Sequence, residues 1–414
     1  MTRTDRSAWQ PLVAGPRAVT LMLTTRCNLA CAYCPQRRGP PHAMSARTLE
    51  AAVRLVARTG HARPKLVLFG GEPLLEKGLV FRALDRLARH ARPGLAPDVR
   101  IVTNGLLLDD ETTDRLEELG VTVELSCDGL PEAQERRGPD TPARLYALLL
   151  RLASRQPGFL DTRLVARLTL DSGNVTFLSR SFDSLIQLGV REIQPAPVYT
   201  PDPGWDDACA ETLDAELERV VDEALDLGPA DGRFAFGPLR GVPVRRPQHS
   251  RAACSLGSPD VLFVDVDGRV APCGAFADSV NPSIPTLAEE LRGPLRGPRV
   301  AASGLEDSLA RRWETATRLP LLHPASDRNS PRDTCASCEA LPECFVCPAS
   351  IAFAPEQDPC LVPAIQCDWN RLVAKHRRAF QRRLASREAD LQRAGSSSSA
   401  AATSAVTPAR IDGA

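Results

Sequence analysis

The sequence has no excess of charge of either sign and no long apolar run. Its 414 residues include 51 Lys and Arg against 51 Asp and Glu, so the formal net charge is zero. This balance lacks the electrostatic footprint of a protein that binds nucleic acid or an anionic membrane. No run approaches the roughly 20 apolar residues of a membrane-spanning helix, and the polar residues 1–11 lack the apolar centre of a signal peptide. We therefore expect a cytoplasmic protein.

Disulfide bonds are not expected either, because the cytosol keeps thiols reduced. The chain has 13 cysteines. Three lie at positions 27–34 and eight between 254 and 367, while Cys127 and Cys209 stand apart. Clustering of this kind indicates metal ligation.

The first cluster, Cys27, Cys31 and Cys34, has the spacing C-x₃-C-x₂-C and follows an apolar run at residues 19–23. A cubane iron–sulfur cluster has four irons, so three cysteines leave one iron open to bind and activate a small molecule. A zinc site is the alternative, but it prefers paired C-x₂-C arms and a fourth ligand. His42 is the candidate for that fourth ligand.

Residues 18–198 alternate between short apolar runs and amphipathic stretches, which predicts a parallel sheet with right-handed helical crossovers, open or closed as a barrel. The expected strands are 19–24, 66–69, 99–103, 121–126, 163–170 and 192–195. The expected helices are 45–58, 79–89, 110–119, 143–154 and 175–188, followed by an acidic helix at 206–227 whose charges we interpret as a solvated face rather than a docking site.

Polar motifs follow the first four expected strands, where parallel α/β sheets place their ligands. Each motif taken alone is also a plausible strand-to-helix turn. On the fifth strand, Arg167 and Thr169 point to one face, and an Arg inside a barrel needs an anion, a bound one or an ordinary ion-pair partner. After the three cysteines, the motifs are Gly70-Gly71-Glu72-Pro73, Thr103-Asn104-Gly105 and Ser126-Cys127-Asp128-Gly129.

A second cysteine cluster follows a stretch rich in Gly, Pro and Arg, residues 228–250, that reads as a linker. Residues 261–270 predict a hairpin that turns at Asp267-Gly268. A four-cysteine zinc knuckle formed by Cys335, Cys338, Cys344 and Cys347 is the alternative to an iron–sulfur site, but it leaves the other cysteines unexplained. These others are Cys254, Cys273, Cys360 and Cys367.

Taken together, the motifs resemble the radical S-adenosylmethionine (SAM) superfamily and, within it, the SPASM-domain subfamily of peptide and protein maturases. The resemblance implies an α/β fold, with a partial (β/α)₆ radical SAM barrel followed by a small cysteine-rich SPASM iron–sulfur domain. The implied division is an N-terminal extension at 1–15, the radical SAM core at 16–227, a linker at 228–253, the SPASM domain at 254–383 and a tail at 384–414. We expect the Ala- and Ser-rich tail to be disordered.

The resemblance also implies three 4Fe–4S clusters. Cys27, Cys31 and Cys34 would hold the SAM-binding cluster, and the second cysteine region would hold two auxiliary clusters. Cys367 is preferred over Cys360 as the last ligand, because the sequence from Cys367 opens a helix as in relatives. No cysteine between 254 and 273 completes the first auxiliary site, which has an open iron or borrows Cys360 or a non-cysteine ligand. The implied ligands are Cys254, Cys273 and Cys347 for the first auxiliary cluster, and Cys335, Cys338, Cys344 and Cys367 for the second.

SAM contacts follow from the same resemblance. Tyr33 is expected beside the adenine, and the Gly70-Gly71-Glu72-Pro73 backbone beside the SAM amine, where a side chain at the glycines would block the approach. A basic residue is expected at Arg136 or Arg137. The remaining expected contacts are Thr103, Asn104, Ser126, Asp128 and Arg167.

The chemistry implied is cleavage of SAM to a 5′-deoxyadenosyl radical that oxidises a ribosomally made peptide or protein by crosslinking or side-chain oxidation. Alternatives are formylglycine formation of the anaerobic sulfatase-maturase type, which Gly274 disfavours because those relatives carry Asp there, and a small-molecule radical dehydrogenase. A non-enzymatic iron–sulfur or zinc scaffold is the alternative outside enzymes. Implied partners are the peptide or protein substrate and a flavodoxin- or ferredoxin-type reductant. About fifteen residues before the barrel are too few for a leader-binding domain, so recognition of a leader peptide is expected in a separate leader-peptide-binding protein or in the SPASM domain.

Overall fold

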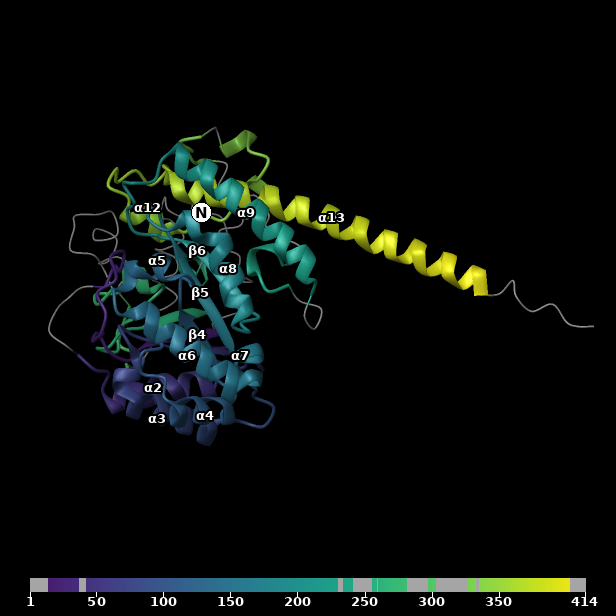
Figure 1. Cartoon of the computed structure of the whole chain (residues 1–414). Helices are drawn as coiled ribbons and strands as arrows, with labels where there is room; N and C mark the ends of the chain where they lie inside the picture. Colours follow the sequence, from purple (N-terminus) through teal and green to yellow (C-terminus); the bar gives the residue numbers. More distant parts are fainter. Residues whose placement is uncertain are drawn as a thin grey trace, which may run out of the picture.

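The fold is seen in a computed structural model of the whole chain (Figure 1). The structure describes residues 14–36, 42–229, 234–240, 255–258, 260–280, 297–302, 327–332 and 335–402. Of the helices in these ranges, none combines the length and the apolar character that crossing a bilayer requires.

One sheet organises the molecule, with the strand order β6-β5-β4-β3-β2-β1-β7-β8. Strands β1 to β6 are parallel, and the expected α/β fold with a parallel sheet is confirmed. Each agrees with a strand expected from the sequence to within a few residues. The bounds are β1 Ala18–Met22, β2 Lys65–Phe69, β3 Asp98–Thr103, β4 Thr122–Ser126, β5 Leu164–Leu170 and β6 Ile193–Pro197.

Helices connect successive strands and bury their apolar faces in one large core, which includes Leu21, Leu68 and Phe182 at 0% exposure. Side-chain caps fix two helix starts, since Ser45 accepts a hydrogen bond from Thr48 N and Asp109 accepts one from Thr112 N. The longer helices are α2 Ala46–Ala57, α3 Lys77–His90, α4 Asp110–Glu118, α6 Thr141–Arg155, α8 Leu178–Gln187 and α9 Asp207–Leu227, and the shorter ones are α5 Pro131–Gln134 and α7 Pro157–Thr162.

The expected hairpin forms between β7 (Val261–Val264) and β8 (Val270–Ala271), and Gly268 in its turn has a φ of +85°. However, β7 also pairs in parallel with β1, so the hairpin extends the sheet of the barrel. This part of the expected SPASM domain therefore packs as a continuation of the barrel sheet, and the boundary at residue 254 stays a prediction. The pairing satisfies the edge of β1 that β2 leaves open.

Part of the expected linker is also packed against the core. Phe236 is fully buried and meets the ring of Phe182 edge to face, with centroids 5.5 Å apart. The rest of the linker lies outside the described residues. Burial of the large apolar Phe236 ring stabilises the packing of this segment against the core, although the segment is rich in Gly and Pro.

Helix α13 (Ala364–Ala402) corrects two expectations. Disorder was expected from residue 384, but the helix continues to Ala402, because Ala, Arg, Leu and Gln favour helix; residues 403–414 lie outside the described ranges. The sequence predicts a solvated acidic face for α9, but α9 lies beside α13 (Figure 1), and a row of ion pairs joins the two helices. These pairs join Lys375 and His376 to Asp214, Arg383 to Asp222, and Arg387 to Asp226.

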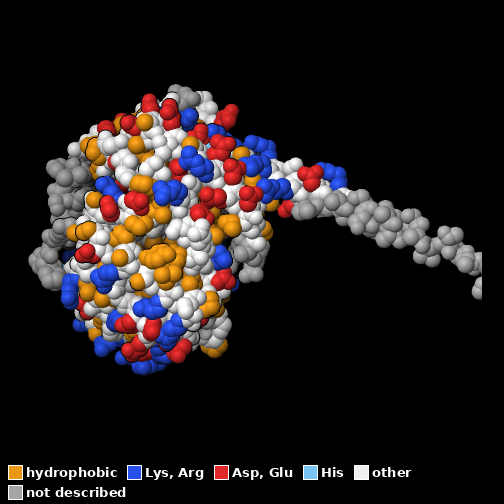
Figure 2. Space-filling view, viewed as in Figure 1, with side chains coloured by type: hydrophobic (Ala, Val, Ile, Leu, Met, Phe, Trp, Pro, Cys, Tyr) orange, Lys and Arg blue, Asp and Glu red, His pale blue; other side chains and the backbone are white. Residues whose placement is uncertain are grey.

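The cysteine-rich C-terminal region has a small core of its own beside the barrel, formed with helix α12 (Pro348–Phe353). Ile351, Ala352 and Phe353 are at 0% exposure in this core, and cysteines pack against it. Figure 2 shows a mixed surface, with Lys and Arg interspersed with Asp and Glu and an apolar patch near the centre of the view. Tyr146 and Leu150 of α6 are 53% and 47% exposed.

Candidate functional site

The first three cysteines lie on the loop that follows β1, at the carboxyl edge of the sheet. Cys34 N donates to Cys31 O at 3.1 Å, which closes a tight turn between two of the thiols. Cys27 and Cys34 are exposed and Cys31 is half-buried. Burial raises the pKa of Cys31 to about 11, Arg137 opposes the rise, and the charges of Cys34 and Cys27 add to it. The three thiols are thus close enough to disfavour each other's ionisation, and bound iron would relieve that repulsion.

The two glycines of the second motif are required by contact between loops. A Cβ atom at Gly71 would lie 2.3 Å from Arg26 O, and one at Gly70 would lie 2.9 Å from Thr24 O. Both loops are also joined by hydrogen bonds, from Gly71 N to Thr24 O at 2.9 Å and from Glu72 N to Arg26 O at 2.8 Å. The sequence interpretation assigned the glycines to close approach by SAM. The contact with the cysteine loop is a separate reason for glycine at both positions.

Glu72 uses its side chain to join the second motif to the third. Its carboxylate is fully buried and accepts hydrogen bonds from Leu74 N at 3.0 Å, Thr103 Oγ1 at 2.7 Å and Asn104 N at 2.7 Å. Burial raises the pKa of Glu72, and these donors oppose that rise. The side chain of Glu72 is therefore occupied within the protein, as is its backbone N–H, which donates to Arg26 O. Pro73 follows as the first residue of a 3₁₀ turn, Pro73–Glu76.

Asn104 connects the third motif to the cysteine loop. Its Nδ2 donates to Asn28 Oδ1 at 2.7 Å, and Asn28 lies directly after Cys27. Asn104 is 8% exposed whereas Asn28 is exposed, so this hydrogen bond is partly buried. The second and third motifs thus both contact the cysteine loop, as expected for residues at the ends of adjacent parallel strands.

Asp128 is held in a buried ion pair with Arg137. Arg137 Nε and Nη2 donate to Asp128 Oδ2 and Oδ1, both at 2.7 Å, and the two side chains are 7% and 1% exposed. Tyr33 OH donates to Asp128 Oδ2 at 3.3 Å, and the guanidinium lies 5.4 Å from the Tyr33 ring centroid. Desolvation raises the pKa of Tyr33, so its hydroxyl stays protonated. The pair therefore fixes the aromatic ring that precedes Cys34.

The choice that the sequence left open between Arg136 and Arg137 is decided by these contacts. Arg136 pairs instead with Asp171, at 2.6 Å. Arg167 does not fill the role of a buried anion-binding residue, because its side chain is 47% exposed and forms an ordinary ion pair with Glu124 at 3.5 Å. Ser126 is half-buried at the end of β4, opposite Arg167 in the register of β4 and β5.

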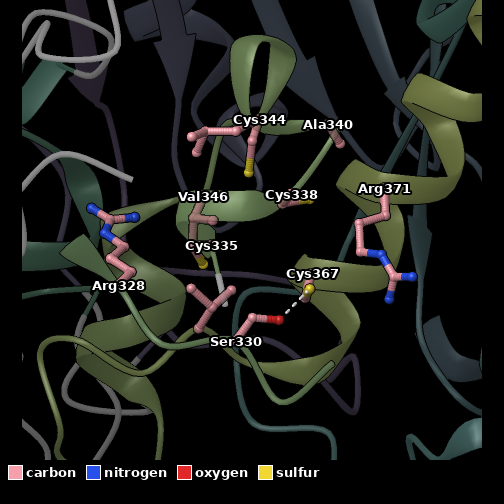
Figure 3. A pocket seen from close by; sticks show the side chains of 11 residues that line it. Arg328, Ser330, Cys335, Cys338, Ala340, Cys344, Val346, Cys367 and Arg371 are labelled. Carbon is pink, nitrogen blue, oxygen red and sulfur yellow. Dashed lines mark hydrogen bonds between the residues drawn. The ribbon is translucent and has the colours of Figure 1, made fainter. Parts of the chain in front are cut away.

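Four of the second-region cysteines line one cavity (Figure 3). Among the residues that the structure describes, no group of three or more His, Cys, Asp or Glu is arranged to hold a single metal ion. Burial raises the pKa of Cys344 to about 12, with smaller contributions from the other three thiols. Four thiols around a cavity fit a multi-iron cluster, which the chain would hold by the same set that the sequence assigned to the second auxiliary cluster. These are Cys335, Cys338, Cys344 and Cys367.

Cys360 does not line this cavity, whereas Cys367 does. Cys273 begins a 3₁₀ turn and Cys347 caps α12, and both pack against the small C-terminal core. Cys254, the third expected ligand of the first auxiliary cluster, lies outside the described residues. Its role stays a prediction.

Tyr199, which sequence reasoning missed, lies between the two groups of cysteines. The charges of Cys273, Cys34 and Cys347 each raise its pKa, after burial as the main cause. Its side chain is 36% exposed. The signal that could have found it is its place just after the sixth strand.

The segment around Tyr199 joins the barrel to the C-terminal region. Gln366 Nε2 of α13 donates to Val198 O at 3.1 Å, and Thr200 Oγ1 donates to Tyr33 O at 3.1 Å. Between these contacts, the Tyr199 ring packs on Phe353 of α12, with centroids 5.8 Å apart. The two cysteine regions are thereby held on opposite sides of one short segment.

Taken with these features, comparison with known proteins defines the class. Residues 21–165 match the model of the radical SAM superfamily. GTP 3′,8-cyclase of Parasynechococcus marenigrum is 31% identical over 316 residues, which cover 67% of this chain and 86% of the relative. The chain belongs to the radical SAM superfamily and is an enzyme. Members of this superfamily use a 4Fe–4S cluster and SAM.

Other similarities are with maturases. The serine-type anaerobic sulfatase-maturating enzyme of Klebsiella aerogenes is 32% identical over 205 residues, which cover 46% of this chain and only half the length of that enzyme. Among solved structures, anSMEcpe with bound AdoMet and the Kp18Cys peptide has a TM-score of 0.66 at 14% identity, covering 89% of this chain and 99% of that one. SuiB of Streptococcus suis bound to its precursor peptide SuiA has a TM-score of 0.55 at 16% identity, covering 86% and 76%. At these identities the structures show a shared fold.

Proposed function

We propose that the chain is a radical SAM enzyme of the SPASM type that oxidatively modifies a ribosomally made peptide or protein, by crosslinking or side-chain oxidation. The observation that carries the proposal is that residues 198–200 contact both cysteine regions: Thr200 donates to Tyr33 O on the first cysteine loop, and Tyr199 packs on Phe353 of α12, the helix that Cys347 precedes. A substrate beside Tyr199 would lie between a radical-generating site and an electron acceptor, as an oxidative radical reaction requires.

In this proposal Cys27, Cys31 and Cys34 hold the SAM cluster, and the other cysteines hold two auxiliary clusters. When bound, the SAM cluster supplies the electron that cleaves SAM to methionine and a 5′-deoxyadenosyl radical. The chain's own residues orient the reactants and exclude water. The Asp128–Arg137 pair fixes the ring of Tyr33 beside the thiols, and Glu72 keeps the second and third loops together.

A peptide substrate is supported by the solved structures of similar fold. The titles of two of them name bound peptides, Kp18Cys for anSMEcpe and SuiA for SuiB. Formylglycine formation is a less favoured form of the same proposal. The sulfatase-maturating enzyme resembles this chain over half of its length, but Gly274 follows Cys273 where the resemblance expects Asp.

A small-molecule substrate is the second candidate, favoured by the long alignment with GTP 3′,8-cyclase. The two candidates differ in whether the second cysteine region must supply the ligands of two auxiliary clusters. A peptide-oxidising SPASM enzyme needs ligands for two auxiliary clusters, and six of the seven expected cysteines belong to the described residues, packed against the small core or lining the four-cysteine cavity.

The test is co-expression of the full chain with each short open reading frame beside its gene, followed by mass spectrometry of the peptide. We expect one peptide to lose two hydrogens, and fragmentation would locate the new bond. In a triple variant, Cys27→Ala with Cys31→Ala and Cys34→Ala, the peptide should stay unmodified. Cys209→Ala is the matched control, because Cys209 lies on α9 and belongs to none of the three expected ligand sets.

SAM turnover separates the alternatives. The anaerobically reconstituted chain should form 5′-deoxyadenosine when reduced, whereas a non-enzymatic scaffold should form none. Turnover without modification of any neighbouring peptide would reject the peptide proposal and favour a sulfatase-type protein or small-molecule substrate.

A further inference from the structure

Two arginines line the four-cysteine cavity together with the thiols (Figure 3). Arg328 is 8% exposed, so its guanidinium lies within the protein, while Arg371 on α13 is exposed. They come from separate segments of the chain, Arg328 from residues 327–332 and Arg371 from α13, and both line the cavity. Positive charge therefore acts on the cavity from two of its walls.

A hydrogen bond to one thiol adds to this effect. Ser330 Oγ lies 2.9 Å from Cys367 Sγ. The same oxygen accepts a hydrogen bond from Arg332 N at 3.1 Å. Toward a Cys367 thiolate, which carries no hydrogen, the Ser330 hydroxyl would be the donor. Arg332 is itself fixed by two 2.8 Å hydrogen bonds to Asp368, the residue after Cys367. The donor is held in place by residues that flank the thiol.

These features have one consequence for a cluster in the cavity. A cubane held by four thiolates carries net negative charge, and reduction adds one more electron. Nearby cations and hydrogen bonds to the ligand sulfurs stabilise the reduced form more than the oxidised form, which raises the reduction potential. A buried charge is weakly screened by water and salt, so Arg328 should act more strongly than Arg371.

We propose that Arg328, Arg371 and Ser330 are positioning residues that raise the reduction potential of the cluster held by Cys335, Cys338, Cys344 and Cys367. This inference rests on the proposed function, which supplies that cluster. The raised potential makes this cluster the preferred acceptor of the electron that leaves the substrate when the oxidised bond forms and a proton is released.

The test needs no substrate. The full chain with Cys27→Ala, Cys31→Ala and Cys34→Ala is reconstituted with iron and sulfide, and its auxiliary clusters are titrated under electron paramagnetic resonance. In this background, Arg328→Gln should lower the reduction equilibrium constant of one cluster at least tenfold, which is about 59 mV for a one-electron couple. Ser330→Ala and Arg371→Gln should shift the same cluster in the same direction by less.

Two controls make the result specific. Arg328→Lys keeps the charge and should keep the potential near that of the parent. Arg383→Gln removes an arginine of α13 twelve residues beyond Arg371, about 18 Å along the helix, and should change nothing. A further pair, Cys335→Ala with Cys338→Ala, identifies which signal belongs to this cavity, because that signal should disappear.

The inference is overturned if the cluster assembles and the reduction potentials of both auxiliary clusters stay unchanged in all three variants, Arg328→Gln, Arg371→Gln and Ser330→Ala. It is also overturned if Arg328→Lys shifts the potential as far as Arg328→Gln, because charge would then not be the cause. If the parent chain and the variant with Cys335→Ala and Cys338→Ala bind the same amount of iron, the second auxiliary cluster does not exist and the proposed function itself is contradicted. Measuring the iron content of both proteins therefore separates failure of the proposed function from failure of this inference.

Discussion

The two cysteine regions are held in different ways. In the barrel, Cys27, Cys31 and Cys34 lie within eight residues on one loop, and that loop is fixed by strand ends above a large apolar core. In the C-terminal region, the thiols come from single 3₁₀ turns and helix ends, and the core described there has only ten buried side chains. Regular secondary structure fixes the first site. The second site depends much more on the metal cluster that its thiols would bind.

Removal of iron should destabilise the C-terminal cysteine region much more than the barrel, and this is the largest effect that we expect. Amide hydrogen exchange in residues 335–362 should rise strongly after anaerobic chelation, because iron–sulfur bonds tie together segments that share only a small core. Exchange in strands β1 to β5 should hardly change. Hydrogen-exchange mass spectrometry of the loaded and iron-free chain measures both. Equal loss of protection in the barrel strands would contradict the comparison.

Within the barrel, the most sensitive point should be the buried ion pair. Arg137→Gln leaves Asp128 as a buried charge without its bidentate partner, which typically costs about 3–5 kcal/mol of unfolding free energy. Urea denaturation of the iron-free chain measures this loss.

Arg155→Gln is the matched control for that variant. Arg155 is 43% exposed and pairs with Asp110 and Asp114 at the surface, so its loss should cost at most about 1 kcal/mol. Equal effects of the two substitutions would show that the Asp128–Arg137 pair contributes no more than a surface pair.

Gly71→Ala should have a smaller effect, confined to the contact between two loops. Its methyl group would lie 2.3 Å from Arg26 O and displace the cysteine loop, at a cost of about 1–3 kcal/mol. Iron bound by Cys27, Cys31 and Cys34 should fall, as measured in a chain whose second-region cysteines are replaced. Gly78→Ala is the control, because nothing lies within 4 Å of that position; retained iron in both variants would refute the contact's importance.

The smallest effect concerns pH and lies away from both cysteine regions. Burial, with the charges of Asp183, Glu216 and Asp222, raises the pKa of Glu223 to about 7. Its Oε2 also lacks a hydrogen bond among the described residues. A raised carboxyl pKa favours the folded state at pH 4.5 and below, and this stability is lost as the pH rises to 7.

Glu223→Gln should therefore be more stable than the parent at pH 8, by about 1 kcal/mol after allowance for solvent screening. The two proteins should unfold alike at pH 4.5. Thermal unfolding at both values checks this, with Glu218→Gln on the exposed face of α9 as the control. A difference that does not depend on pH would rule out titration of Glu223 as the cause.

The sequence by itself determined the local elements and the chemical character of the site. The periods of apolar residues located six parallel strands and the helices between them, because burial of one helix face or of alternate strand residues is a local pattern. The spacing of Cys27, Cys31 and Cys34 and the polar motifs after each strand followed from the same local logic. The family resemblance implies the set of Cys335, Cys338, Cys344 and Cys367, and these four thiols line one cavity in the structure.

Only the tertiary structure decided which distant groups meet. It selected Arg137 over Arg136 as the partner of Asp128, gave Arg167 an ordinary ion pair, and placed Tyr199 between the cysteine regions. It also joined β7 to β1 and α13 to α9. Some of these pairings join chain segments more than a hundred residues apart. Packing of the whole core brings such segments together, and no local period in the sequence indicates it.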